Sequence, residues 1–200
     1  MLGIANAGSL TDSDVPSEMK TERWYLDEQY FDIAFAKQYF ADFKKLDKPV
    51  YIGVIDTGIN YNHELFKKTL LWVEDNGTQK PVGYNVGNSA TPALISDSAS
   101  DYHGTHVAGI ISSIILELGL EDSVKIIPVR ATNSQNQFTS TAVAAAIRWL
   151  CGENGLEARL GHKLECSVIN MSISILKSAI TSSSSWSNLT KLQGAINDYV

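Results

Sequence analysis

The sequence is poor in the features that mark several classes of protein. Its 200 residues include only two cysteines, Cys151 and Cys166, and the spacing of this pair matches no zinc signature. The longest apolar stretch, around 107–120, is interrupted by two serines and Glu117, and it is too short for a bilayer, which takes about 20 apolar residues. Acidic residues outnumber basic ones by 22 to 16, for a net charge of -6. We therefore expect no membrane span and no nucleic-acid partner.

The composition is that of a folded chain. Hydrophobic residues make up 44% and charged residues 19% of the sequence, which is typical of a globular protein rather than a disordered or fibrous one. A chain of this length suits one domain or most of one. Residues 1–23 run through Asp12, Ser13 and Pro16 and predict a flexible N-terminal segment, so we place the domain at 24–200.

The two cysteines bracket a glycine-rich, charged stretch at 152–165 that looks inserted between a helix and a strand. A disulfide could close this stretch at its base, and it would add about 3 kcal/mol of stability in the chain-entropy model. Two buried thiols fit the sequence equally well. The cysteines therefore leave both alternatives open.

Apolar strand-like runs alternate with segments of helical periodicity. Strands are predicted at 50–55, 82–86, 124–129 and 166–171, and helices at 28–43, 107–120, 139–150 and 187–199. Pro128 must lie at the end of its strand or where the strand needs no backbone donor. Crossover connections of this length predict an α/β fold with a parallel sheet and helices on both of its faces.

Asp56 and His103 are predicted to meet at one edge of this sheet. Asp56 ends the first strand and His103 begins the next long helix, so both lie beyond the carboxyl ends of strands, where α/β proteins bind ligands. A serine hydroxyl needs a base to take its proton, and imidazole can do this at neutral pH. A carboxylate on the other ring nitrogen fixes the tautomer and stabilises the imidazolium. In this interpretation Asp56 orients His103, and His103 is the base.

Each motif has other interpretations when it is taken alone. The Asp-Thr-Gly tripeptide at 56–58 also occurs as an ordinary turn after a strand and as the catalytic tripeptide of aspartic proteases. His103 and His106 could be two metal ligands or the capped start of a helix. We expect His106 to point into the helix packing and Gly109 to bring the helix close to the sheet.

Several blocks, in this order, resemble the subtilisin-like serine proteases. They are Val54-Ile55-Asp56-Thr57-Gly58, His103-Gly104-Thr105-His106-Val107-Ala108-Gly109, Ile127-Pro128-Val129-Arg130-Ala131 and Val168-Ile169-Asn170-Met171-Ser172. The resemblance covers most of the chain from Trp24 onward. It implies a serine endopeptidase that cleaves peptide or protein substrates, with Asp56 and His103 in an Asp-His-Ser triad.

The resemblance also implies how a substrate would be held. The family's strand at 168–172 lies beside an extended peptide and pairs with it by β-augmentation. Asn170, Ser172 and Ser174 are therefore candidate substrate-binding residues. The family usually has a glycine pair after the serine, whereas Ile173 and Ser174 follow here, so we expect the usual subsite geometry to change.

Expectations about cofactors and compartment rest on the resemblance alone. Calcium is possible in this family, but the Asn- and Gly-rich insertion that builds the usual site is absent, and His63-Glu64 replaces the usual Pro-Asp or Pro-Glu. We therefore expect no cofactor and no metal ligands at that site. Tyr102 is another departure, since a small residue commonly precedes the histidine. The family implies an extracellular or cell-envelope location, while the residues themselves leave the cytoplasm open.

The family's third block, Gly-Thr-Ser-Met-Ala with the nucleophilic serine, does not occur in this sequence, and no serine lies in a comparable glycine setting. We expect a domain truncated before its oxyanion and nucleophile segments, inactive alone and completed by the C-terminal remainder of the same domain. A non-catalytic remnant or pseudoprotease that binds a peptide or partner is the alternative. An aspartic protease using Asp56 in a homodimer would need an all-β chain, which the helical patterns contradict.

Overall fold

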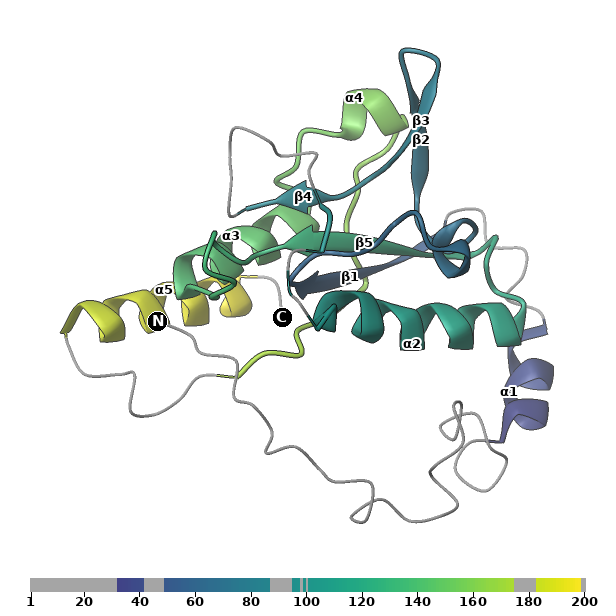
Figure 1. The fold of residues 1–200 in the computed structure, drawn as a ribbon, viewed down its shortest axis with the longest axis horizontal. Helices are drawn as coiled ribbons and strands as arrows, with labels where there is room; N and C mark the ends of the chain where they lie inside the picture. The colour runs from purple at the N-terminus through teal and green to yellow at the C-terminus, as the bar shows by residue number, and fades with distance from the viewer. Residues whose placement is uncertain are drawn as a thin grey trace.

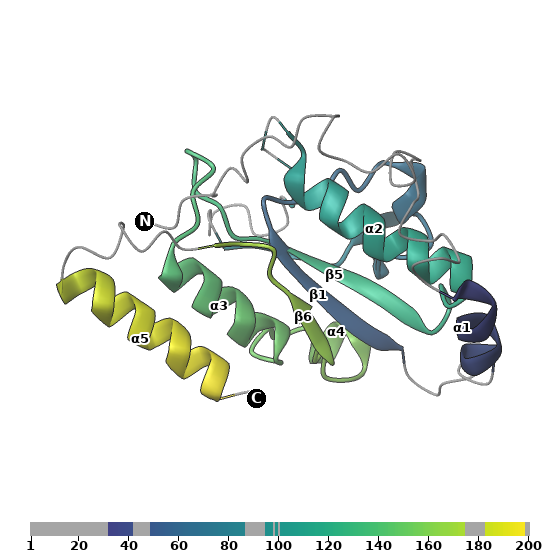
Figure 2. The same ribbon diagram turned by 90° about the horizontal axis from the view of Figure 1, so that it is seen from below.

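A parallel sheet forms the centre of the protein. The computed structural model describes residues 32–41, 49–86, 95–97, 99, 101–174 and 183–198. Within these residues the sheet has four strands, all with parallel neighbours. Their order across the sheet is β4 (Tyr84–Asn85), β5 (Val124–Arg130), β1 (Val50–Asp56) and β6 (Val168–Asn170). Figure 1 shows β4, β5 and β1, and Figure 2 shows β6 beside β1. The predicted fold class is thus confirmed.

The strands differ in length from the predicted runs. β1 and β5 each extend one residue beyond the predicted end. β4 keeps only two residues of 82–86, and β6 keeps three residues of 166–171. Both shortened strands lie at the edges of the described sheet, where each pairs with one neighbour.

Helices cover both faces of the sheet (Figure 2). α2 (His103–Leu118) lies on one face, and α3 (Ser140–Leu150) lies with α5 (Ser183–Asn197) on the other. Successive residues of β1 enter two separate cores, because Val54 packs with α2 whereas Ile55 packs with α3. A strand that is buried on both faces reads as a continuous apolar run, which is why β1 and β5 were evident in the sequence.

The first described helix lies inside the predicted range 28–43, of which residues 28–31 and 42–43 fall outside the described residues. α1 (Ile33–Tyr39) begins after Asp32, its N-cap, which accepts a hydrogen bond from the Phe35 N–H at 2.8 Å. A carboxylate in this position satisfies a donor that the first helical turn leaves unpaired. The predicted flexible segment 1–23 lies outside the described residues.

The other helix boundaries follow their caps. Thr139 caps α3 as expected, since its hydroxyl accepts a hydrogen bond from the Ala142 N–H at 3.1 Å. α2 begins at His103, as expected for that residue, and ends before Gly119, which has a φ of 65°. α5 begins at Ser183, so Ser187 lies inside the helix instead of capping it.

A hairpin of β2 (Trp72–Asp75) and β3 (Thr78–Pro81) was not predicted. Asn76 and Gly77 connect the strands with φ angles of 51° and 76°, which is typical of a two-residue type I′ turn. The Asn-Gly pair is the strongest short-range hairpin signal, so the sequence did carry the information. The short α4 (Glu157–Leu160) lies inside the 152–165 stretch.

Pro128 lies inside β5 without interrupting its pairing with β1. Within a strand, the N–H and C=O of one residue face the same side. The Ile126 N–H bonds to the Thr69 C=O at 2.7 Å, and the Arg130 C=O accepts from the Val86 N–H at 2.9 Å. Both residues therefore face away from β1. Pro128 lies midway between them and faces the same way, so its missing donor removes no bond to β1.

Cys151 and Cys166 are free thiols, and both are partly buried. They lie near each other, because the Cys166 N–H bonds to the C=O of Leu150 at 2.9 Å and both thiols line one small pocket. Burial is the main reason that the pKa of each thiol is raised, that of Cys166 to about 12. Of the two alternatives left open by the sequence, a disulfide or two thiols, the structure therefore contains two thiols.

We predict that both thiols react slowly in the folded protein, because the thiolate is the reactive form and a raised pKa keeps it scarce. A chromogenic disulfide reagent, added at mildly alkaline pH without reductant, should titrate few thiols before unfolding and both of them after unfolding in urea. A protein that releases none after unfolding would contain a disulfide, contrary to this structure.

Candidate active site

Asp56, the last residue of β1, has a side chain that is only 1% exposed. Its Oδ1 accepts a hydrogen bond from the Thr57 N–H at 2.7 Å and lies 2.8 Å from Nδ1 of His103. Within the described part of the chain, its other oxygen, Oδ2, is buried without a hydrogen-bond partner. The carboxylate is thus held through one oxygen, by the backbone and the imidazole together.

Burial raises the pKa of Asp56, because the charged carboxylate loses its hydration there. The hydrogen bonds from His103 and from the Thr57 N–H act in the opposite direction, whereas the negative charge of Asp97 adds to the rise. In such a poorly hydrated place, a positive charge on His103 interacts with the carboxylate more strongly than it would in water. The site is therefore suited to stabilising an imidazolium.

His103 is the first residue of α2, so the helix holds its imidazole at the carboxyl edge of the sheet. The side chain is 33% exposed. Because Nδ1 faces Asp56, Nε2 is the ring nitrogen that can exchange a proton with a group outside the pair. The expected contact with Asp56 is present, although the two residues are 47 apart in sequence.

Gly104 allows the start of α2 to approach the turn after β1. A Cβ at this position would lie 2.3 Å from the C=O oxygen of Gly58 and 3.0 Å from the Cβ of Asp56. A Cβ on Gly109 would meet only Leu65 Cδ2, at an ordinary 3.6 Å. Gly104 is therefore the glycine at which α2 makes its close approach to the turn after β1. The expectation that Gly109 brings the helix close to the sheet is wrong.

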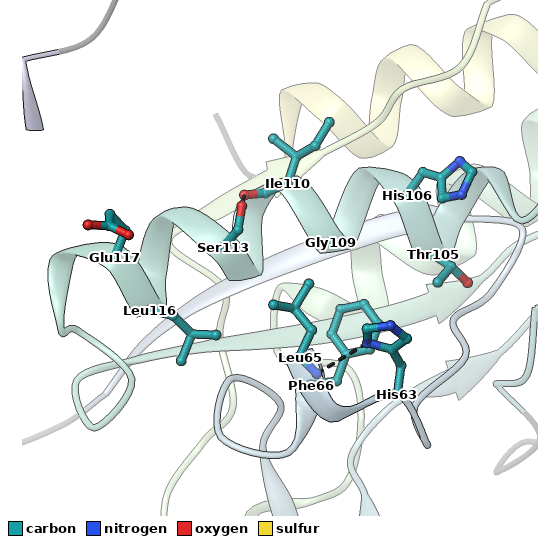
Figure 3. A pocket seen from close by; sticks show the side chains of 10 residues that line it. All are labelled: His63, Leu65, Phe66, Thr105, His106, Gly109, Ile110, Ser113, Leu116 and Glu117. Atoms are coloured by element: carbon teal, nitrogen blue, oxygen red, sulfur yellow. Dashed lines mark hydrogen bonds between the residues drawn. The ribbon is translucent and has the colours of Figure 1, made fainter. Parts of the chain in front are cut away.

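His106 is exposed and borders a groove, so the expectation that it points into the helix packing is also wrong (Figure 3). The groove has a volume of about 790 Å³ and separates α2 from the 3-10 turn η4 (Glu64–Phe66). Its apolar lining includes Leu65, Phe66 and Ile110. Since His103 is the histidine that bonds Asp56, the two histidines of the motif have separate environments.

The candidate substrate-binding residues lie at the same edge of the sheet as Asp56. β6 pairs with β1 in a register that places Asn170 opposite Val54. The Ser172 hydroxyl donates a hydrogen bond to Oδ1 of Asn170 at 3.0 Å. Ser172 and Ser174 are exposed in the segment that follows β6. The structure therefore brings Asn170 and Ser172 together, and Ser174 follows along the same segment.

Two polar side chains beside the pair were missed by the sequence analysis. The Thr57 hydroxyl donates to Oδ1 of Asp97 at 2.8 Å and accepts from the Gly104 N–H at 2.9 Å. Asp97 lies in an irregular stretch before α2, where no hydrophobic period or motif marks a position. The one signal that the sequence offered was the place of Thr57 inside the Asp-Thr-Gly tripeptide.

Metal ligation and membrane insertion find no support in the described ranges. No group of three or more histidine, cysteine and acidic side chains there is arranged to hold a metal ion. No helix among the same residues is long and apolar enough to span a membrane. The expectation that the usual calcium site is absent stays a prediction.

Comparisons with known proteins place these motifs in a family. The subtilase family matches residues 47–199. Subtilisin-like protease 5 of Arthroderma otae is 29% identical over 124 residues, which is 62% of this chain and 26% of that protein. Subtilisin DY of Bacillus licheniformis is 29% identical over 127 residues, 62% of this chain and 36% of that protein. The crystal structure of a cold-adapted subtilisin-like serine proteinase aligns with a TM-score of 0.41 and 26% identity, over 75% of this chain and 43% of that one.

The match covers most of the chain and includes both Asp56 and His103. The chain belongs to the subtilase family, a family of serine proteases. It spans about a quarter of the length of the first curated relatives that it matches.

The two glycines of the α2 motif give a matched test of the packing. We predict that Gly104→Ala lowers the free energy of unfolding by about 1–3 kcal/mol, because the methyl group forces the helix away from the backbone of Gly58. Gly109→Ala should be neutral or should stabilise by up to about 1 kcal/mol, through helix propensity. Urea unfolding midpoints measure both changes. Equal effects at the two positions would contradict the packing described for Gly104.

Proposed function

We propose that the protein is a serine endopeptidase of the subtilisin type, in which Asp56 and His103 are two members of the catalytic triad. The observation that carries this proposal is the 2.8 Å contact between Oδ1 of Asp56 and Nδ1 of His103. It joins an almost fully buried carboxylate to an imidazole that solvent can still reach. Membership of the subtilase family supports the choice of reaction.

In the proposed mechanism His103 is the general base. Its Nε2 takes the proton of the nucleophilic serine as that oxygen attacks the carbonyl carbon of the peptide bond, and it then gives the proton to the leaving amine. Asp56 accepts the hydrogen bond from Nδ1–H, which fixes the tautomer with a free Nε2, and its charge stabilises the imidazolium. In this proposal the serine and the oxyanion donors belong to the C-terminal remainder of the same protease domain, and this remainder packs with the present chain to complete the site.

The substrate would lie along the segment that follows β6. An extended peptide can add its backbone to such a segment as a further strand. The exposure of Ser172 and Ser174 and the position of Asn170 next to β1 support this placement. It brings a bound peptide to the edge of the sheet at which His103 lies.

The alternative proposal is a non-catalytic subtilase that binds a peptide or partner at the same edge. It requires the exposed segment after β6 but no nucleophile. The names of the relatives, which describe proteases, favour the enzyme. For the compartment we propose an extracellular or cell-envelope location, on the basis of the family alone.

The test uses the complete polypeptide that contains this chain and a fluorophosphonate probe, which labels activated serines. We expect stoichiometric labelling together with hydrolysis of an unstructured protein. His103→Ala should abolish both, because the serine then lacks its base. His106→Ala is the matched control: it removes the same side chain one turn further along α2, from a position that makes no bond to Asp56, and both activities should persist.

Two results would overturn the proposal. Absence of labelling in a folded, complete protein would favour the non-catalytic alternative. Loss of activity in the His106 variant but not in the His103 variant would show that the base has been assigned to the wrong histidine.

Asp56→Asn should separate catalysis from stability. In serine proteases with this arrangement, the corresponding change lowers kcat by about 10⁴-fold, because the amide holds the wrong tautomer and cannot stabilise the imidazolium. Since burial raises the pKa of Asp56, the folded protein holds the carboxyl proton more tightly than the unfolded chain does. Ionisation above the unfolded pKa, about 3.9, therefore weakens the folded state of the wild type.

This linkage predicts a pH-dependent difference in stability. The melting temperature of Asp56→Asn, relative to the wild type, should rise as the pH increases from below the unfolded pKa through the raised folded pKa. Any unpaired N–H of the new amide lowers the melting temperature by the same amount at every pH. The test is therefore how the difference in melting temperature changes with pH. A difference that is constant with pH, measured by differential scanning fluorimetry, would contradict the raised pKa.

A further inference from the structure

Asp97 precedes α2 and has no part in the proposed reaction, yet both of its carboxylate oxygens are engaged beside the site. Oδ1 accepts hydrogen bonds from the Thr57 hydroxyl at 2.8 Å and from the Ala99 N–H at 3.1 Å. Oδ2 accepts from the Thr105 N–H at 2.9 Å and from the Thr105 hydroxyl at 2.6 Å. One side chain thus ties the turn after β1 to the first turn of α2.

Thr57 completes this connection. Its hydroxyl donates to Asp97 and accepts from the Gly104 N–H at 2.9 Å. Thr57 directly follows Asp56, and Gly104 directly follows His103. A series of hydrogen bonds from Gly104 through Thr57 and Asp97 to Thr105 therefore joins the turn after β1 to the start of α2, next to the proposed catalytic pair. We call these four residues the clamp.

The clamp replaces the ordinary cap of α2. Tyr102 is the N-cap residue, but it adopts a left-handed conformation with a φ of 52° and makes no side-chain cap hydrogen bond. The N–H groups of the second and third helical residues, Gly104 and Thr105, instead bond to Thr57 and Asp97. These groups have no partner within a helix. Asp101 adds a longer bond, since its Oδ1 accepts from the His103 N–H at 3.3 Å. Thr57 and Asp97 thus cap two N–H groups of α2 and also fix its position against β1.

The backbone around Asp97 is itself held against the same turn. The Ile59 N–H bonds to the C=O of Ile95 at 2.8 Å, and the Asp97 N–H bonds to the C=O of Ile59 at 3.3 Å. Thr57 is fully buried, with 0% exposed. Loss of the Asp97 carboxylate would therefore leave the hydroxyl of a buried residue, Thr57, without its acceptor.

We propose that Asp97, acting through Thr57 and Thr105, is a positioning residue that keeps His103 at hydrogen-bond distance from Asp56. The proposal rests on the function proposed above. Catalysis is sensitive to this distance, because a misplacement of about 1 Å can reduce a rate by about 10²-fold. Asp97 itself touches neither substrate nor the reacting atoms.

The tests are Asp97→Asn and Thr57→Val, with Thr57→Ser as the conservative counterpart. An amide has one acceptor oxygen, so Asp97→Asn must turn an NH₂ group toward the N–H of either Ala99 or Thr105. Thr57→Val keeps the side-chain shape but removes the hydroxyl, whereas Thr57→Ser retains it. Asp32→Ala is the stability control, since Asp32 also caps a helix, α1, through one oxygen, and alanine removes that cap.

The readouts separate position from stability. Active sites are titrated with the fluorophosphonate, so that kcat refers to folded enzyme only. Asp97→Asn and Thr57→Val should lower kcat by about 10- to 100-fold and change KM by less than about twofold. Thr57→Ser should restore most of the kcat, and Asp32→Ala should lower the melting temperature without changing kcat.

A spectroscopic signature tests the geometry without activity. The proton between Nδ1 of His103 and Asp56 should give a far-downfield NMR signal in the wild type and in the Asp32 and Thr57→Ser variants. The signal should weaken through faster exchange in Asp97→Asn and Thr57→Val. An inactive wild type that retains this signal would overturn the proposed function but not the clamp. Unchanged kcat and an unchanged signal in Asp97→Asn would overturn the clamp, whatever its melting temperature.

Discussion

The structure depends on the hydrogen bond between Oδ1 of Asp56 and Nδ1 of His103, which joins the end of a strand to the start of a helix. This bond can exist only if α2 begins close to the turn after β1. The missing side chain of Gly104 makes the approach possible, and the hydrogen bonds of Thr57 and Asp97 fix it. The burial that makes the Asp56 carboxylate unfavourable on its own also makes its interaction with a charged imidazole strong. Burial of this carboxylate therefore lowers the stability of the folded protein while it favours the proposed chemistry.

The two ends of the sheet have different roles. The carboxyl end of β1 carries Asp56, whereas the amino end holds the 152–165 stretch in place. There the Tyr51 hydroxyl lies 2.8 Å from Nε2 of His162, and the two rings stack with an interplanar angle of 2°. Asn154 adds hydrogen bonds to the C=O groups of Trp149 and Leu164, both at 2.8 Å. This stretch is thus attached away from the proposed active site, and changes in it need not alter the contact between Asp56 and His103.

The sequence was sufficient for the parts that depend on regular patterns. β1 and β5 are buried on both faces and appear as apolar runs, and the meeting of Asp56 with His103 follows from the rule that strands of a parallel sheet end at one edge. Contacts that depend on irregular backbone were not predictable. The position of Asp97 is set by the loop that holds it, and the absence of a close contact at Gly109 depends on which side of α2 faces Gly58. His106 was misjudged because helical period alone does not tell which side chains border a groove.

The order of the strands has a consequence for how the protein reaches its native state. β1 is the first strand of the sheet in sequence, yet it lies between β5 and β6, and Val50 pairs with Val124 while Ile52 pairs with Val168. As the chain leaves the ribosome, β1 emerges long before either neighbour exists. It must remain unpaired until β5, which begins only at Val124, has been synthesised, and sheets built from such distant contacts fold slowly. The apolar segment that ends at Asp56 therefore needs protection from aggregation during synthesis.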